Sequence, residues 1–178
     1  MKSNIALIGF MGTGKSASGK ALAEKLEMEY VDLDSLVEEK TGKSITDIFK
    51  SHGEPFFRKL ESEAVSEASK KSHAVISCGG GVALYPSNIE DLKRTAVIVY
   101  LQAEPDVVLD RVKENAGIRP LLRFTNPART IAELMKARRP LYEQAADMVI
   151  DTSRLNIDEV ASKIIAGLTE NESINLKK

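Results

Sequence analysis

The segment GFMGTGKS at residues 9–16 constrains the fold of this chain more than any other part of the sequence. It matches the pattern G-x-x-x-x-G-K-[S/T], and it stands between the apolar run 5–8 and the amphipathic run 15–26. A strand, a glycine-rich loop and a helix in this order form a phosphate-binding loop, in which backbone N–H groups and the helix N-terminus surround nucleotide phosphates. The motif therefore predicts an α/β fold with a nucleotide site where the first strand ends.

The rest of the chain alternates short apolar runs with longer amphipathic ones, which is typical of βαβ units. Strands are predicted at 5–8, 30–33, 74–77, 96–101 and 148–150, and helices at 15–26, 34–40, 45–51, 54–70, 106–114, 131–144 and 158–168. The strands are apolar on both faces, which predicts a parallel sheet with helices on both sides. We expect one domain over 1–170, with a substrate-binding helical region at 33–73 over one end of the sheet and a disordered tail at 171–178.

Composition excludes several classes of protein. The chain has 178 residues and a net charge of -1, which argues against a protein that coats nucleic acid or an anionic membrane. Its single cysteine, Cys78, cannot form an internal disulfide, and no run approaches the ~18 apolar residues of a membrane span. We therefore expect a cytoplasmic protein without nucleic-acid or membrane partners. We also expect it to act as a monomer.

The phosphate loop alone does not distinguish a kinase from a GTPase switch or a motor. Lys15 can reach the β- and γ-phosphates, and the Ser16 hydroxyl can bind the Mg²⁺ that bridges them. The D-x-x-G and [N/T]-K-x-D patterns of a GTPase do not occur in the sequence. Asp151, which follows the last apolar run, lacks the second acid of a motor domain, so we interpret it as a turn or cap residue.

An acceptor site is indicated by the segments that follow the second and third strands. With a period of two, Asp32 and Asp34 project from one face of the second strand toward the ligand crevice. Asp32 would then lie near the metal, and Asp34 would accept a hydrogen bond from the attacking hydroxyl; alternatively, Asp34 only caps the next helix. The glycines that follow Cys78 let a ligand approach the backbone closely, although they could also form a simple turn. Cys78 itself is predicted to be a buried strand residue.

Arginines supply candidate partners for an acidic acceptor, because the planar guanidinium binds both oxygens of a carboxylate. Arg58 lies early in a predicted helix, and Arg138 and Arg139 precede Pro140. For each of them a solvated surface charge is the alternative. The segment 115–129 is basic and is broken by glycine and proline, and loops of this length are usually functional or mobile.

Taken in order, the segments GFMGTGKS, VDLDS, FFRKLE, CGGGV, RPLL and RRPLYEQAAD resemble the shikimate kinase family, from residue 5 to about residue 165. The resemblance implies a three-layer P-loop kinase fold with a five-stranded parallel sheet in the order 2-3-1-4-5. It also implies transfer of the γ-phosphoryl group of ATP to the 3-hydroxyl group of shikimate, a step of chorismate and aromatic amino-acid biosynthesis. Two alternatives stay open: another small-molecule kinase of this fold, such as a gluconate or nucleoside-monophosphate kinase, and a non-catalytic ATP-binding module.

The resemblance also assigns roles to single residues. It places ATP on Gly12, Thr13, Gly14, Lys15, Ser16 and Ala17, and it places Mg²⁺ on Ser16 with Asp32 in its outer shell. It places shikimate against Asp34, Arg58, Gly79, Gly80, Gly81 and Arg138, since the spacing Arg-x-Pro-Leu-Tyr selects Arg138 over Arg139. The lid is implied to be 115–129, with Arg119 on the phosphates, so that Asp34, Lys15 and Arg119 are the catalytic candidates. Arg111 and Arg154 are alternative candidates for contact with adenine.

Overall fold

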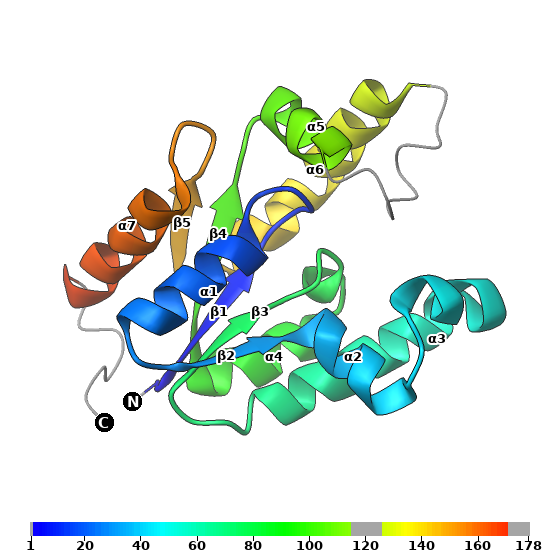
Figure 1. The fold of residues 1–178 in the computed structure, drawn as a ribbon, viewed down its shortest axis with the longest axis horizontal. Helices are drawn as coiled ribbons and strands as arrows, with labels where there is room; N and C mark the ends of the chain where they lie inside the picture. Colours follow the sequence, from blue (N-terminus) through cyan, green and yellow to red (C-terminus); the bar gives the residue numbers. More distant parts are fainter. Residues whose placement is uncertain (1, 115–125, 171–178) are drawn as a thin grey trace.

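Five parallel strands form one sheet in the order β2-β3-β1-β4-β5, which confirms the predicted fold (Figure 1). The strands are β1 (Asn4–Ile8), β2 (Glu29–Asp32), β3 (Ala74–Ser77), β4 (Ala96–Gln102) and β5 (Met148–Asp151). The computed structural model describes residues 2–114 and 126–170. Because all strand pairs are parallel, the carboxyl ends of the five strands meet at one edge of the sheet.

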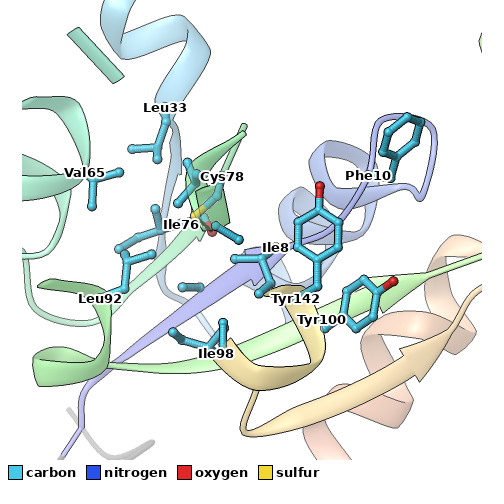
Figure 2. Packing of buried hydrophobic residues seen from close by; sticks show 14 of the residues in the cluster. Ile8, Phe10, Leu33, Val65, Ile76, Cys78, Leu92, Ile98, Tyr100 and Tyr142 are labelled. Atoms are coloured by element: carbon cyan, nitrogen blue, oxygen red, sulfur yellow. Dashed lines mark hydrogen bonds between the residues drawn. The ribbon is translucent and has the colours of Figure 1, made fainter. Parts of the chain in front are cut away.

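Alternate residues of the central strands fill two separate cores. Ile5 and Leu7 of β1 lie in the core that α1 (Lys15–Lys25) and α7 (Ile157–Glu170) cover. Ala6 and Ile8 lie in the opposite core, which receives side chains from α2 (Leu33–Thr41), α3 (Ile45–Ala68), α4 (Pro86–Thr95), α5 (Pro105–Glu114) and α6 (Pro127–Ala145) (Figure 2). Helices on both faces explain why these strands are apolar throughout.

The helical region after β2 differs from its prediction at the start of α2. Leu33 is not the last residue of the strand but the first of the helix, because the Asp32 side chain caps that helix. Asp34 therefore lies in the first turn of a helix, and the strand geometry predicted for the two aspartates is wrong. The predicted break between 51 and 54 is confirmed: Gly53 has φ 79° and ψ 176°, which kinks α3.

Two further segments differ from the sequence prediction. A short 3₁₀ helix, η1 (Val82–Leu84), and α4 occupy a stretch for which no element was predicted. Helix α6 begins at Pro127 rather than at 131, because the Asn126 side chain accepts a hydrogen bond from the Arg129 N–H and caps it. Residues 127–129 are thus helical, and the prediction of an irregular loop is wrong for them. The rest of the predicted lid, with Arg119, and the predicted tail at 171–178 lie outside the described residues.

Within residues 2–114 and 126–170, the helices are all too short or too polar to span a membrane.

Candidate active site

The phosphate loop joins β1 to α1 at the carboxyl edge of the sheet. Gly9, Gly12 and Gly14 have φ values of 144°, 77° and 92°, a range that L side chains rarely adopt. The Lys15 ammonium donates to Gly9 O and Phe10 O, both at 2.8 Å, and the residue is only 9% exposed. The loop thus curls around the end of the lysine side chain and holds a positive charge beside the helix N-terminus, where an anion is favoured.

The Asp32 carboxylate connects the phosphate loop to α2. Its Oδ2 accepts hydrogen bonds from Ser16 Oγ at 3.2 Å and from Tyr30 OH at 3.0 Å. Its Oδ1 accepts from the backbone N–H groups of Asp34 at 3.1 Å and Ser35 at 3.3 Å. Burial, and the Asp32 charge after it, raise the pKa of Tyr30 to about 12, so this hydroxyl stays protonated and can donate to Asp32. The carboxylate is therefore held by contacts from three elements.

Ser16 and Asp32 fit the donor set of a nucleotide-bound Mg²⁺ ion. Mg²⁺ in kinases keeps several waters and is bound through one or two protein oxygens together with phosphate oxygens. Across the described residues, His, Cys, Asp and Glu form no group of three or more that could hold a metal by itself. A hydroxyl and a carboxylate at the phosphate loop are thus suited to an ion that arrives with the nucleotide.

The Asp34 carboxylate reaches from the first turn of α2 toward the triple glycine. A methyl group added to Gly79 would lie 3.2 Å from Asp34 Oδ1 and 2.5 Å from Glu61 Oε1. Although the residue as a whole is exposed, this inward carboxylate is desolvated, and burial together with the Asp32 charge raises its pKa. The charges of Lys15 and Arg58 act in the opposite direction. Asp34 does not cap α2, because Asp32 fills that position.

Arg58 and Glu61 form a buried ion pair on α3. Arg58 Nη1 lies 2.7 Å from Glu61 Oε2, with the Glu61 side chain 1% and the Arg58 side chain 12% exposed. Burial raises the pKa of Glu61, and the Arg58 charge opposes that effect. The guanidinium lies so close to Gly81 that a methyl group there would overlap it. The absence of side chains in this loop therefore makes room for Arg58 and Glu61 as well as for a ligand.

The second edge of the Arg58 guanidinium faces an exposed partner. Nε and Nη2 both donate to Glu54 Oε1, at 3.1 and 3.0 Å, and the Glu54 side chain is 59% exposed. A guanidinium binds carboxylates bidentately through such an edge. Since an exposed ion pair contributes little to stability, a ligand carboxylate can replace Glu54 there at small cost.

Tyr142 and Arg138 complete the site from α6. The Arg138 guanidinium lies 5.6 Å from the centre of the Phe10 ring, and its Nη1 lies 4.0 Å from the position of a methyl group on Gly80. Tyr142 OH donates to Gly80 O at 2.5 Å, and the ring stacks on Tyr100 at 5.1 Å between centroids (Figure 2). Both residues thus bring α6 against the phosphate loop and the triple glycine.

Arg139 points elsewhere. It is exposed, and its Nε donates to Glu143 at 2.7 Å along the same helix. The structure therefore brings Arg138, and not Arg139, to the other site residues.

The two candidates for adenine contact differ in placement. Arg111 Nη1 donates to Gly12 O at 3.3 Å and to Thr152 Oγ1 at 3.1 Å, and Nη2 donates to Thr152 O at 2.8 Å. Arg154 is exposed, just beyond the turn in which Asp151 accepts from Ser153 N–H and Oγ–H. Arg111 is thus bound to the phosphate loop itself, and Asp151 is the turn residue that the sequence predicted.

Sequence reasoning missed three site residues, Glu61, Tyr142 and Thr152. Glu61 stands three residues after Arg58, a helical spacing that places the two side chains together, so the pattern could have indicated this pair. Tyr142 ends the spacing Arg-x-Pro-Leu-Tyr, but that pattern did not indicate its contact with Gly80, 62 residues away along the chain. Nothing local marks Thr152, whose partner Thr13 lies 139 residues away. Cys78 is 2% exposed, and burial raises its pKa, which makes it the inert strand-end residue that was predicted.

Comparison with known proteins gives one consistent family. The family model described as shikimate kinase matches residues 11–169. The chain is 46% identical over 162 residues to the shikimate kinase of Caldanaerobacter subterraneus subsp. tengcongensis, covering 91% of this chain and 94% of that protein. The shikimate kinase of Thermodesulfovibrio yellowstonii is also 46% identical over 162 residues, with 91% and 92% covered. The structure of shikimate kinase from Acinetobacter baumannii in complex with shikimate matches with a TM-score of 0.91 at 35% identity, over 97% of this chain and 96% of that chain.

Proposed function

The chain belongs to the shikimate kinase family, and we propose that it transfers the γ-phosphoryl group of ATP to the 3-hydroxyl group of shikimate. The observation that carries this proposal is the convergence of Asp34, Arg58 and Arg138 on the triple glycine beside the phosphate loop. One carboxylate and two guanidinium groups match an acceptor that has hydroxyl groups and a single carboxylate.

Arg58 and Arg138 would bind the shikimate carboxylate. Among the described residues, the Nε and Nη2 edge of Arg58 faces the exposed Glu54, whereas its Nη1 is held by the buried Glu61. Glu61 thereby fixes the plane of the guanidinium and leaves the bidentate edge for the substrate. The glycines at 79–81 would let the ring of shikimate approach the backbone closely.

Asp34 would receive the 3-hydroxyl group. Its carboxylate lies between the triple glycine and the N-terminus of α2, and its raised pKa brings it nearer to that of a useful general base. The Lys15 charge acts on the same carboxylate from the phosphate loop, which supports acceptor and donor sites next to each other. Phosphoryl transfer depends chiefly on this kind of positioning and on neutralisation of charge.

The nucleotide would bind on residues 12–17, with its phosphates on the loop amides and on Lys15. Mg²⁺ would be held by Ser16 and, through water, by Asp32, and when bound it neutralises charge on the phosphate oxygens. Arg119 lies outside the described residues, so its assignment to the phosphates rests on the segment RPLL alone. The division into one kinase domain with a helical substrate region at 33–73 and a lid at 115–129 belongs to the same proposal.

A coupled ADP-release assay tests the proposed function. Purified protein with ATP and Mg²⁺ should release ADP rapidly with shikimate and only at background rates with gluconate or nucleoside monophosphates. Mass spectrometry should show a product heavier than shikimate by one phosphoryl group. Rapid turnover of gluconate would favour the related small-molecule kinase, and ATP binding without any turnover would favour a non-catalytic module.

The expected monomeric state can be measured by light scattering, and the expected cytoplasmic location stays a prediction.

A further inference from the structure

Thr152, the first residue after β5, connects this edge strand to the phosphate loop. The residue is 2% exposed, and its Oγ1 lies 3.0 Å from Thr13 O and 3.1 Å from Gln102 O. Gln102 O already accepts the Thr152 N–H at 2.8 Å. The hydroxyl has one proton to donate, and Thr13 O is the nearer acceptor. The Thr152 side chain thus bridges the end of the sheet and the loop.

Arg111 extends this contact into a short chain of hydrogen bonds. Its Nη1 donates to Thr152 Oγ1 at 3.1 Å and to Gly12 O at 3.3 Å, and its Nη2 donates to Thr152 O at 2.8 Å. The carbonyl groups of two successive loop residues, Gly12 and Thr13, are therefore held from α5 and from the end of β5. A hydroxyl that accepts from a guanidinium is a better donor to the next carbonyl, since such chains polarise.

These carbonyl contacts determine where the loop amides point. The trans peptide is planar, so the C=O of one residue and the N–H of the next point in opposite directions. A Thr13 carbonyl fixed on Thr152 turns the Gly14 N–H away from β5. The Thr13 N–H and Oγ1–H are directed to Phe10 O, at 3.4 and 2.8 Å, inside the loop. The orientation of the amides that would receive phosphate is thus set from outside the loop.

We propose that Thr152 is a positioning residue for nucleotide binding: its hydroxyl, supported by Arg111, fixes the Thr13–Gly14 peptide so that the phosphate loop is preorganised for the polyphosphate. The residue itself touches no reacting atom. This inference deepens the proposed function and rests on it, because it assigns the loop to ATP. Loss of the hydroxyl should weaken nucleotide binding. It should not change the acceptor site, which lies beyond β1, on the β3 side of the sheet.

The test compares Thr152→Val, which keeps the shape of the side chain, with Thr152→Ser, which keeps the hydroxyl. Calorimetry measures the affinity for ADP and, separately, for shikimate without nucleotide. Thr95→Val is the matched control: Thr95 Oγ1 donates to Ser69 O at 2.8 Å and accepts from Asn4 at 3.3 Å, but at the opposite end of the sheet. It removes a hydroxyl with the same kind of contacts, far from the loop.

Thr152→Val should weaken ADP binding about tenfold, as expected for a buried hydrogen bond whose partners are left unpaired, and change shikimate affinity by less than about twofold. Thr152→Ser should keep the ADP affinity of the wild type. Thr95→Val should lower thermal stability and leave the affinities for ADP and shikimate unchanged. Unchanged ADP affinity in Thr152→Val, or equal weakening of both ligands, would overturn the proposal. If Thr152→Val does not fold, Thr152→Ala allows the same comparison. A wild-type protein that binds ADP but does not phosphorylate shikimate would refute the proposed function without changing this test.

Discussion

Replacement of Arg58 by leucine should separate the two roles of this residue, one in stability and one in binding. Glu61 is 1% exposed, and among the described residues its ion-pair partner is Arg58, at 2.7 Å. Removing one member of a buried ion pair leaves an uncompensated charge and costs about 3–5 kcal/mol of unfolding free energy. In a domain of 178 residues this corresponds to a melting temperature lower by on the order of 10 °C. Shikimate affinity should fall by about 2–4 kcal/mol, because the bidentate edge is lost.

The double variant Arg58→Leu/Glu61→Gln distinguishes these effects. Without the buried carboxylate the charge penalty disappears, so the double variant should recover most of the lost stability. Its shikimate affinity should stay low, since the guanidinium is still missing. Thermal unfolding and calorimetric titration with shikimate measure the two quantities, with the single variant Glu61→Gln as the control. Recovery of shikimate binding in the double variant would show that repulsion by Glu61, and not the loss of Arg58, weakened the single variant.

The effect on stability should depend on pH in a definite direction. Burial raises the pKa of Glu61 in the folded state above its ordinary value even with Arg58 present, so without Arg58 the raising effect is larger. A raised acid pKa destabilises the fold above the unfolded pKa, which is about 4.3 for Glu, and the penalty disappears as the carboxyl becomes protonated. The deficit of Arg58→Leu relative to the wild type should therefore be largest at pH 7–8 and shrink toward pH 4–5. A deficit that is independent of pH would refute the reasoning from a buried charge.

Three further predictions concern the acceptor site. Arg138→Leu should raise the KM for shikimate in a steady-state assay by about tenfold or more, as expected for loss of a charge-assisted contact. The control Arg139→Leu, at the adjacent exposed residue, should change this KM by less than about twofold. Asp34→Asn should lower kcat by about 10²-fold or more. Because the Asp34 pKa is raised, wild-type kcat should fall as pH decreases through that pKa, a limb that Asp34→Asn should lack; a wild-type profile without it would contradict the assignment. Glu54→Gln should strengthen shikimate binding, measured by calorimetry, by about two- to fivefold, because it removes a competing carboxylate from an exposed ion pair with Arg58. Weaker binding would show that Glu54 supports the site instead.

The buried ion pair Arg58–Glu61 on α3 also shows what a sequence pattern can predict and what it cannot. The segment FFRKLE predicted Arg58 in a helix, which the structure confirms. Its role in binding shikimate stays a prediction, which its position beside Gly81 supports. The segment did not show that Glu61 is buried or that Glu54 covers the other edge of the guanidinium. Burial of a charge depends on what packs above it, and here that is a loop between β3 and η1.

The sequence by itself determined the elements whose cause is local. The phosphate loop needs glycine at positions of positive φ, the strands need apolar residues on both faces, and the kink at Gly53 follows from glycine near proline. Each of these requirements is met within a few residues of chain. The resemblance to the family depended on several such segments in the right order along the chain, and the sheet order was implied by that resemblance.

Only the tertiary structure decided which contacts each of these side chains makes. Asp32 caps α2 and holds Ser16, so Asp34 is free of the capping role and its carboxylate reaches the triple glycine. Arg138 meets the phosphate loop while its neighbour Arg139 faces solvent, and Thr152 reaches Thr13 across 139 residues of chain. These assignments depend on desolvation and on hydrogen bonds between distant segments, and those exist only once the strands lie parallel and their carboxyl ends meet at one edge.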